Sequence, residues 1–513
     1  MSKEEQDKDA IIAELIESNA QLTAKVERLQ SMLDAAIKML HGSKSEKLDP
    51  AQLELLLDPE AAKKPVAADC DQDAPAADSR PKKKRNSKLR KSLENLPVKV
   101  TELTPDEVLA EPDAFRLIRY ADPSDKLAVK PAEFWVERTV RGIYARKDNP
   151  YTPPVVAPLP PCLLEGSVLT PSLLANIIAE KFCYHQPLYR QEWRMRIAHD
   201  IHITRNIFSH WMNVGAERLE PLYKHLAKKI RESDYVQVDE TPIKYLKPGN
   251  GKTAQAYFWV YNVPNLGVLY DWKNERGNTA LDSVLCAGES SFNGVLQCDG
   301  YSAYPTWIGK QKSATIEQAA CMAHVRRKFF EAKDDHAKLT RWVLHQISLL
   351  YGIESRLRAQ RAGPALREAV RCAESRPIYQ RLETVFTKLK QRSSITPRSK
   401  LGEALHYALG QWSHIETYLR NGQVEIDNNL AENAVRPTKL GAKNWMFVGG
   451  EDTGWRSAIL FTMVENCRRL GRDPHAYLEW VFERLLTATN QDDYEQLMPA
   501  AWAAAHPLPS KAA

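Results

Sequence analysis

Residues 235–239 read Tyr-Val-Gln-Val-Asp, and residues 294–299 read Gly-Val-Leu-Gln-Cys-Asp. Each stretch is a short apolar run that predicts a buried β-strand, and each run ends at a carboxylate, Asp239 or Asp299. An aspartate in this position is often only a turn former that bonds to nearby backbone amides, so the pattern leaves two interpretations open.

The sequence between these two runs predicts the rest of a sheet. Residues 257–261 (Tyr-Phe-Trp-Val-Tyr) and 266–270 (Leu-Gly-Val-Leu-Tyr) predict two strands joined by a turn. A helix is expected over 279–285, and residues 317–322 are a candidate fifth strand. Three antiparallel strands, a helix and then strand–helix–strand is the ribonuclease H-like order. In that order the first and fourth strands lie side by side, which would make Asp239 and Asp299 neighbours.

Two neighbouring carboxylates repel each other unless a cation lies between them. Oxygen ligands suit Mg²⁺ or Mn²⁺, and two such ions ~4 Å apart stabilise both the attacking and the leaving oxygen of a phosphoryl displacement. The sequence therefore predicts a divalent-metal site that acts on phosphodiesters.

A third carboxylate lies in residues 425–437, Glu-Ile-Asp-Asn-Asn-Leu-Ala-Glu-Asn-Ala-Val-Arg-Pro. We expect Asp427, Asn428 or Asn429 to cap a helix that carries Glu432, with Pro437 ending the regular helix. Arg436 would lie one turn after Glu432 on the same face. The alternative is a capping box, in which the Glu432 side chain reaches back to Asn429.

The first 92 residues predict two segments without a globular core. Residues 8–41 carry an apolar heptad repeat, with Asn19 at one core position, and predict a dimerising coiled coil; an amphipathic helix packed on its own protein is the alternative. Residues 49–92 read as a disordered linker, in which 80–91 hold eight Lys or Arg and no acid. That basic run is either a DNA-backbone arm or a solvated charge run. Its centre is Lys82, Lys83, Lys84 and Arg85.

The remaining sequence predicts further units around the core. Residues 93–150 suggest a small β-rich unit, and the proline-rich stretch 150–161 suggests an extended connector. Residues 162–230 read as helical, and 189–212 resemble a helix-turn-helix whose second helix ends near Trp211; DNA binding and core packing explain it equally well. We expect the catalytic core over 231–330 and 425–480, a helical insertion over 331–424, and a C-terminal tail over 481–513.

Composition narrows the class of protein. A chain of 513 residues exceeds one ordinary core, so the fold class expected is multi-domain α/β. The net charge of +6 does not by itself indicate nucleic acid. No two of the eight cysteines lie within four residues of each other, which is typical of reduced thiols in a cytoplasmic protein. We see neither a signal peptide nor an apolar stretch that spans a bilayer, so no membrane partner is expected.

Several short motifs together resemble transposases of the insertion-sequence-66 group. They are Val238-Asp-Glu-Thr-Pro242, Cys298-Asp-Gly-Tyr301, Ala323-His-Val-Arg-Arg-Lys-Phe329, Asp427-Asn-Asn-Leu-Ala-Glu432 with Arg436-Pro437, Gly441-Ala-Lys-Asn-Trp445 with Gly449-Gly450, and His41-Gly-Ser-Lys-Ser-Glu-Lys47. The resemblance runs in order from about residue 10 to 490. It implies Asp239, Asp299 and Glu432 as the catalytic and metal-binding triad, with Mg²⁺ or Mn²⁺.

The resemblance also implies a reaction and its partners. Water is expected to cut at the element's terminal inverted repeats, and the freed 3′-hydroxyl then attacks target DNA. A homodimer or higher oligomer, accessory proteins of the same element and association with the nucleoid are expected as well.

The same resemblance suggests residues that contact DNA. His324, Arg326, Arg327 and Lys328 are expected at phosphates near the scissile bond, together with Arg436; Lys439 is expected to steady the transferred strand end, and Trp445 to stack on an unpaired base. For each residue the alternative is a surface charge or a core aromatic.

One departure from the family concerns zinc. The family usually carries cysteine pairs between the coiled coil and the helical region, but no cysteine occurs here from Asp71 to Pro161. We therefore expect no zinc in the 93–150 unit.

Two alternatives to a transposase remain from the sequence. A coiled-coil, helix-turn-helix DNA-binding regulator without catalysis explains residues 1–230 but not the three carboxylates. A nuclease of the same fold explains the carboxylates, and only strand-transfer products would separate it from a transposase.

Overall fold

The computed structural model describes residues 161–507, except 248–251, 288–289, 312–314, 393, 451–452 and 487–490, together with the short segments 133–137, 143–144 and 155–156. The predicted coiled coil (8–41), the linker (49–92) and Lys82 to Arg85 lie outside the described residues. Of the 93–150 unit and its connector, the structure describes a two-stranded pairing of β1 (Ile143–Tyr144) with β2 (Val155–Val156).

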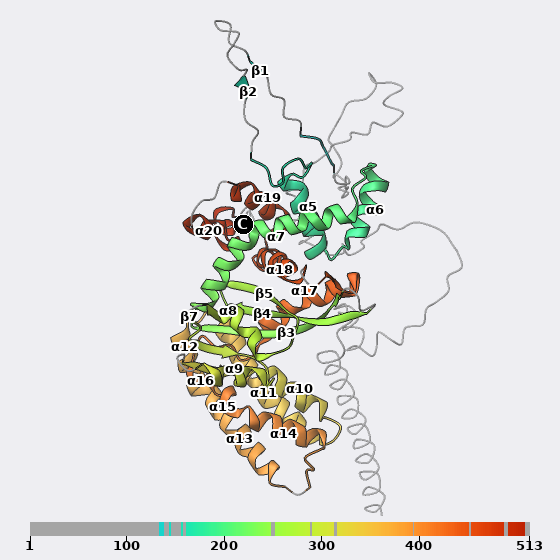
Figure 1. Cartoon of the computed structure of the whole chain (residues 1–513). Helices are drawn as coiled ribbons and strands as arrows, with labels where there is room; N and C mark the ends of the chain where they lie inside the picture. Colours follow the sequence, from blue (N-terminus) through green and yellow to red (C-terminus); the bar gives the residue numbers. More distant parts are fainter. Residues whose placement is uncertain are drawn as a thin grey trace, which may run out of the picture. The chain divides into compact units, whose positions relative to one another are not determined.

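A six-stranded mixed sheet forms the centre of the described chain, and Figure 1 shows it between two groups of helices. The strand order is β5 (Gly267–Lys273), β4 (Thr253–Val263), β3 (Tyr235–Leu246), β8 (Gly294–Gln297) and β9 (Ile316–Ala319). β3, β4 and β5 are antiparallel, whereas β8 and β9 run parallel to β3. The predicted meander and the predicted pairing of the first and fourth strands are both present.

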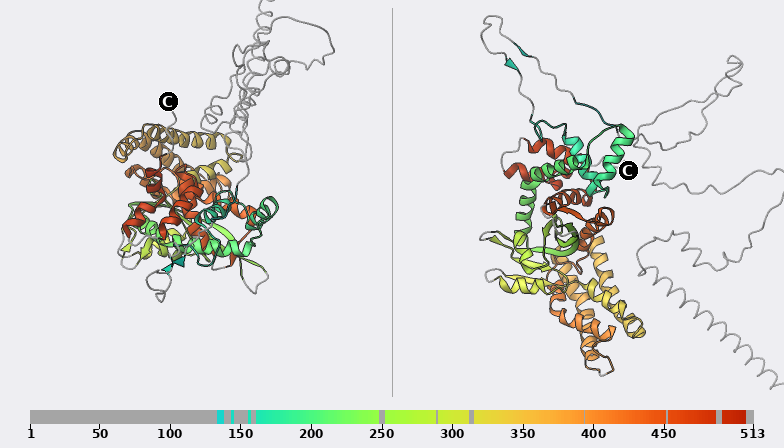
Figure 2. Two further views of the ribbon diagram at one scale, coloured as in Figure 1. Left: turned by 90° about the horizontal axis from the view of Figure 1, so that it is seen from above. Right: turned by 45° about the vertical axis from the view of Figure 1, so that its right-hand side comes forward.

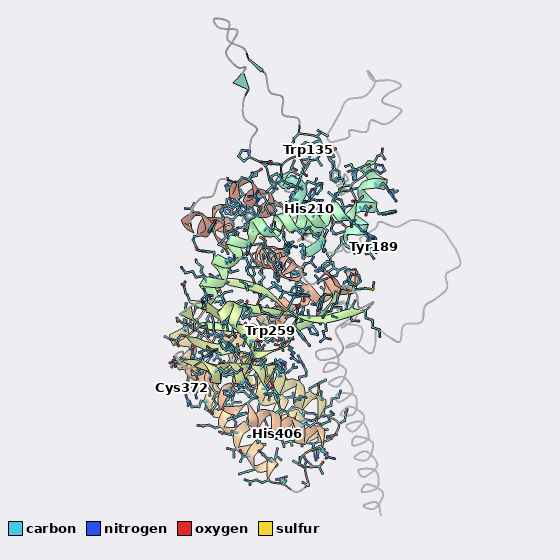
Figure 3. The ribbon with its side chains drawn as sticks, in the orientation of Figure 1. Trp135, Tyr189, His210, Trp259, Cys372 and His406 are labelled. Atoms are coloured by element: carbon cyan, nitrogen blue, oxygen red, sulfur yellow. The ribbon has the colours of Figure 1, made fainter. Side chains whose placement is uncertain are left out.

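The sheet is buried because its strands are apolar on both faces. β4 is almost continuously buried from Phe258 to Val263, and Trp259 lies fully buried within the sheet (Figure 3). Strands covered on both sides lose the alternation of apolar and polar residues. That is why this part of the sequence reads as an apolar run.

Three features of the sheet differ from the sequence prediction. β3 does not end at Asp239 but continues to Leu246, because β4 pairs with it over that whole length. Residue 319 ends β9, and the next helix begins at Met322. A short strand, β10 (Val448–Gly450), pairs with β3 in parallel and was not predicted.

One side of the sheet is covered by helices that precede the strands in the sequence and by helices that follow them, and all of them share one apolar core. They are α5 (Pro171–Phe182), α7 (Arg205–Arg231), α17 (Asn429–Trp445), α18 (Gly454–Arg469) and α19 (Pro474–Leu485). α18 packs on β5, and α17 packs on β3 and β4. The predicted C-terminal tail is wrong for its described part, because α20 (Gln491–Leu497) and α21 (Pro499–Ala505) add Leu497 and Trp502 to this core.

Both helices predicted over 189–212 are present, and the first is α6 (Leu188–His199), which ends at Asp200 in a left-handed conformation. The second helix, α7, does not end near Trp211 but continues to Arg231. An unbroken apolar stripe explains the length, because residues from Phe208 to Ile230 on one face are buried in the main core. Packing is thus the main determinant of α7.

Residues 331–424, predicted as a helical insertion, are mostly helical, and the group of helices that shares their core begins earlier, at Met322. It comprises α10 (Met322–Glu331), α11 (Ala337–Ala359), α12 (Pro364–Val370), a π-helical turn (Arg371–Ser375), α13 (Arg376–Lys390), α14 (Lys400–Gly410), α15 (Trp412–Ile415) and α16 (Thr417–Arg420). These helices gather beyond the β9 edge of the sheet (Figures 1 and 2). Their apolar cluster joins the sheet through Tyr235, Val295 and Ala319.

Two short elements precede β8, the 3₁₀ turn Asn278–Leu281 and α8 (Asp282–Leu285), where one helix was predicted. β6 (Cys286–Ala287) and β7 (Ser290–Ser291) form a small hairpin, and α9 (Ala303–Lys310) follows β8. Among the described residues, none of the helices has both the length and the apolarity that a membrane span requires.

Candidate active site

Asp239 and Asp299 lie at the point where β8 stops beside β3. The last parallel pair is Gln237 with Gln297, so each aspartate follows that pair by two residues. Asp299 begins the loop after β8, where its Oδ1 accepts a hydrogen bond of 2.9 Å from the Tyr301 amide.

Glu432 reaches this point from the first turn of α17, which crosses β3 (Figure 1). The helix begins at Asn429, and the Asp427 carboxylate accepts hydrogen bonds from the Asn429 amide and side chain. Glu432 does not close a capping box, because its two oxygens face His324 and Arg327. Pro437 also does not end the helix, since the loss of one backbone donor is outweighed by the packing of α17 on the sheet.

The charges of the other carboxylates act on Asp239. Burial raises the pKa of Asp239 well above its ordinary value, and the negative charges of Glu240, Asp299 and Glu432 raise it further. Like charges held this close favour either a shared proton or a bound cation. The sheet and α17 thus build a pocket of negative charge from three distant parts of the sequence.

Two buried glutamines hold the segment that carries Glu432 against the sheet. The Gln237 side chain donates to the Asp427 carbonyl at 3.1 Å, and the Gln297 side chain donates to the Glu425 carbonyl at 2.8 Å. Gln237 also donates to Gln297, at 2.9 Å. Successive side chains of a strand alternate between its faces, so Gln237 and Asp239 share one face. That face is the one on which residues 425–427 dock.

Glu240 faces the other side of β3 and is not part of the pocket. Its carboxylate accepts hydrogen bonds from Arg276 and Tyr304, and its side chain is only 2% exposed. The Arg276 guanidinium lies 3.8 Å from the centre of the Tyr301 ring. Because the Tyr301 amide bonds to Asp299, this chain of contacts links Glu240 to the loop that carries the second aspartate.

Of the basic residues that the sequence predicted near the pocket, Arg327 has a direct contact with one of the three carboxylates. Arg327, on α10, lies 3.6 Å from Glu432 Oε2 and is 56% exposed. Lys328 is partly exposed and Arg436 is exposed. Lys439 donates from Nζ to the Pro242 carbonyl at 2.7 Å, which ties α17 to β3. Arg326, on the same helix as Arg327, is partly buried.

Trp445 packs inside the protein. Its ring contacts Phe182, Phe461 and His185, and the Lys181 ammonium lies 5.5 Å from its centre. The position of Gly441 reflects the same packing, since a Cβ there would lie 2.2 Å from the Trp445 ring. These contacts correspond to the core aromatic alternative and leave little of the ring for a base.

The sequence prediction missed two sets of residues that the fold brings to the site. One set is Gln237 and Gln297, whose signal is a Gln-x-Asp pattern shared by both strand ends. The other is Cys321, three residues before His324, for which the sequence predicted only a phosphate contact. Their ligand atoms and that of Glu432 lie within 4.8 Å of one another.

Family models match most of the described chain. Residues 166–455 match the model described as "Transposase IS66 family", which covers the strands, the insertion and Glu432. The chain belongs to the IS66 transposase family. Residues 462–500 match the IS66 C-terminal element, and residues 28–100 match a model described as "Transposase C of IS166 homeodomain".

Relatives of the IS66 chain match it along nearly its whole length. The uncharacterized protein y4jD of Sinorhizobium fredii is 32% identical over 94% of this chain and 96% of its own. The uncharacterized protein y4qI of the same organism is 29% identical over 97% of this chain and 94% of its own. Family membership supports a transposase role that acts on DNA.

Proposed function

We propose that the chain is a DNA transposase with a ribonuclease H-like core, in which Asp239, Asp299 and Glu432 hold Mg²⁺ or Mn²⁺ and direct phosphodiester cleavage and strand transfer. The observation that carries the proposal is that Asp239 and Asp299 follow the same parallel pair of β3 and β8, while Glu432 lies on a helix that packs on β3 and its charge acts on Asp239. The strand order β5-β4-β3-β8-β9, with the aspartates after its central parallel pair, supports the fold assignment.

The residues of the pocket fit a divalent cation. Three carboxylates supply the oxygen donors that Mg²⁺ and Mn²⁺ prefer. The buried Glu432 Oε1 has no hydrogen-bond partner within the described part of the chain, which is unusual for a buried oxygen unless a ligand completes it. A bound divalent cation would neutralise the charge that develops at the phosphorus and lower the pKa of an attacking water.

The protein's own groups contribute positioning and charge. Asp239 lies in β3, Asp299 directly follows the end of β8, and the glutamine pair fixes the segment that leads to Glu432, so the fold positions all three carboxylates. We infer that Arg326, Arg327, Lys328, Arg436 and Lys439 bind the DNA backbone around the pocket. Such contacts orient a scissile phosphate without reading sequence.

The proposed partners are the terminal inverted repeats of the element and a target DNA. Synapsis of two ends requires at least two copies of the chain, and residues 8–41 are the proposed dimerisation segment. The basic run at 80–91, with Lys82, Lys83, Lys84 and Arg85, is proposed as an additional arm on the phosphate backbone.

The test is a nicking and strand-transfer assay of the full chain with Mg²⁺, on DNA that carries the sequences flanking this reading frame. Asp239→Asn, Asp299→Asn and Glu432→Gln are each expected to lower product formation roughly a hundredfold to a thousandfold or more. Asp234→Asn is the matched control, because this exposed aspartate directly precedes β3 and lies outside the pocket.

Thermal unfolding separates lost chemistry from lost fold. Asp239→Asn removes a buried negative charge from beside three others, so we expect its melting temperature to equal or exceed that of the wild type. Nicking that survives in the triad variants would overturn the proposal. Cleavage without strand-transfer products would point to a nuclease, and DNA binding without cleavage would point to a regulator.

A further inference from the structure

We propose that His324 is a metal ligand of this site and, with Glu432, gives it a preference for a first-row transition-metal ion such as Mn²⁺ over Mg²⁺. The inference rests on the proposed function for the role of Glu432. It assigns His324, which the sequence suggested as a phosphate contact, to the metal itself.

The spacing of the two side chains is the first observation. His324 Nδ1 lies 3.7 Å from Glu432 Oε1. A charge-assisted hydrogen bond between an imidazolium and a carboxylate would bring these atoms to about 2.8 Å. A separation of 3.7 Å is too long for that bond, but it lies below the limit of about 4.2 Å between two donors that bind one ion at about 2.1 Å each.

The second observation is that both facing atoms are buried without a partner. His324 Nδ1 and Glu432 Oε1 are shielded from solvent, and neither makes a hydrogen bond to any described residue. The Asn428 Oδ1 atom has the same property, and Asn428 as a whole is only 1% exposed. Buried polar atoms usually have a partner, so these unpaired atoms beside one another in the sequence and the structure support the assignment of an ion to His324 and Glu432.

Neighbouring contacts hold these groups in position. Asn428 donates from its side chain to the Val238 carbonyl, next to Asp239, and from its backbone to Cys321 Sγ at 3.2 Å. Arg327 holds the other oxygen of Glu432. Glu432 Oε1 is therefore directed toward His324, while the segment that carries it is fixed beside the first aspartate.

The preference for Mn²⁺ over Mg²⁺ follows from the kinds of atom that would bind the ion. Mg²⁺ takes oxygen ligands, whereas an imidazole nitrogen adds affinity for first-row transition-metal ions. Cys321 Sγ belongs to the same cluster, but it already accepts the Asn428 amide, and a thiol suits softer ions than Mn²⁺. We therefore assign the nitrogen and the carboxylate, and not the sulfur, to Mn²⁺.

The experiment measures Mn²⁺ bound to the full chain, without DNA and without reference to activity. With ¹⁵N-labelled histidine and one equivalent of Mn²⁺, electron spin echo modulation is expected to show a coupled imidazole nitrogen. His324→Ala is expected to remove that coupling and to weaken Mn²⁺ binding by on the order of tenfold or more in calorimetry, with a smaller change for Mg²⁺.

A matched variant and a conservative variant complete the design. His406→Gln is the control, because His406 is an exposed histidine of α14 in the insertion (Figure 3) and should leave coupling and affinity unchanged. His324→Gln keeps an oxygen donor near the ion, so it should retain Mg²⁺ binding while losing the nitrogen signal. Circular dichroism establishes that each variant is folded.

The outcomes separate this inference from the proposed function. If the nitrogen coupling and the Mn²⁺ affinity persist in His324→Ala while Asp239→Asn abolishes nicking, the histidine assignment is overturned and the transposase proposal stands. If His324 ligates Mn²⁺ but the triad variants still cut DNA, the proposed function fails and the ligand assignment stands.

Discussion

At the scale of single residues, Glu240 shows how one carboxylate can stabilise the fold beside others that are proposed to act on DNA. Glu240 follows Asp239 directly, yet strand alternation directs it to the opposite face of β3. There Arg276 and Tyr304 satisfy it. Sequence neighbours of the same charge thus have separate roles, and only the strand conformation decides which is which.

Glu240→Gln is expected to destabilise the protein. The amide replaces one charged acceptor by a donor, so it weakens the hydrogen bonds from Arg276 and Tyr304 at a nearly buried position. We expect the free energy of unfolding in urea to fall by about 1–3 kcal/mol. Glu275→Gln is the control, because Glu275 is exposed on the neighbouring loop. Equal urea midpoints for the two variants would contradict the role given to Glu240.

At the scale of elements, the docking of α17 is the event that completes the site. The segment before α17 lies 190 residues from β3 in sequence, and the two buried glutamines bind its backbone carbonyls. Hydrogen bonds to a backbone fix position without depending on the side chains of the docked segment. The sheet therefore binds the backbone of the segment that leads into α17, and not the Glu432 side chain itself.

Gln297→Leu is expected to weaken the docking of the segment before α17 without changing any of the three carboxylates. The substitution leaves the Glu425 and Ala320 carbonyls without their donor and Tyr235 without its acceptor. We expect nicking to fall by roughly tenfold or more, because small displacements of catalytic groups are costly, and stability to fall by about 1–3 kcal/mol.

Gln318→Leu provides the comparison for this prediction. Gln318 is a buried glutamine of the next strand, and its side chain bonds to the Cys298 thiol instead of the docked segment. The docking role of Gln297 would be refuted if both variants nicked DNA at the same rate.

At the scale of the whole molecule, the insertion is joined to the site by a buried ion-pair network. Glu354 and Arg371 are both fully buried, and they pair at 2.8 Å. Arg367 bonds to Glu354 and to Glu425, and Arg358 bonds to the other oxygen of Glu425. The π-helical turn Arg371–Ser375 places the Arg371 side chain in this network. A helical unit with its own core is thereby connected to the segment that leads to Glu432.

This network makes stability depend on pH. Burial alone would raise the pKa of Glu354, but Arg371, Tyr418 and Arg367 lower it to about 2 from an ordinary value of 4.5. A lowered pKa in the folded state adds stability that is complete above pH 4.5 and is lost as the pH falls toward 2. The shift corresponds to on the order of 3 kcal/mol.

Glu354→Gln is expected to remove this dependence. The difference in unfolding free energy between wild type and variant should shrink as urea denaturation is repeated at successively lower pH between about 5 and 2. Glu383→Gln, at an exposed position of α13, should give a difference that does not change with pH. A constant difference for Glu354→Gln would contradict the ionised, paired state of this residue.

The sequence alone predicted five strands of the sheet and the pairing of β3 with β8, and it named the three carboxylates. Apolar runs such as 235–238 and 294–298 carry that information locally, because burial on both faces demands it. The sequence did not determine where β3, α7 and α17 end. β3 is extended by pairing with β4, α7 by its packing against the core, and α17 passes Pro437 because it rests on the sheet.

Only the tertiary structure decided which side chains from distant parts of the sequence contact one another. The partners of Gln297, the packing of Trp445 against the core, and the approach of His324 to Glu432 all depend on long-range packing. Local sequence specifies backbone preference and apolar faces, whereas contacts between segments 100 or more residues apart exist only after the chain has packed. For that reason the three carboxylates could be predicted from the sequence, whereas the glutamines that position the segment before α17 became evident only from the fold.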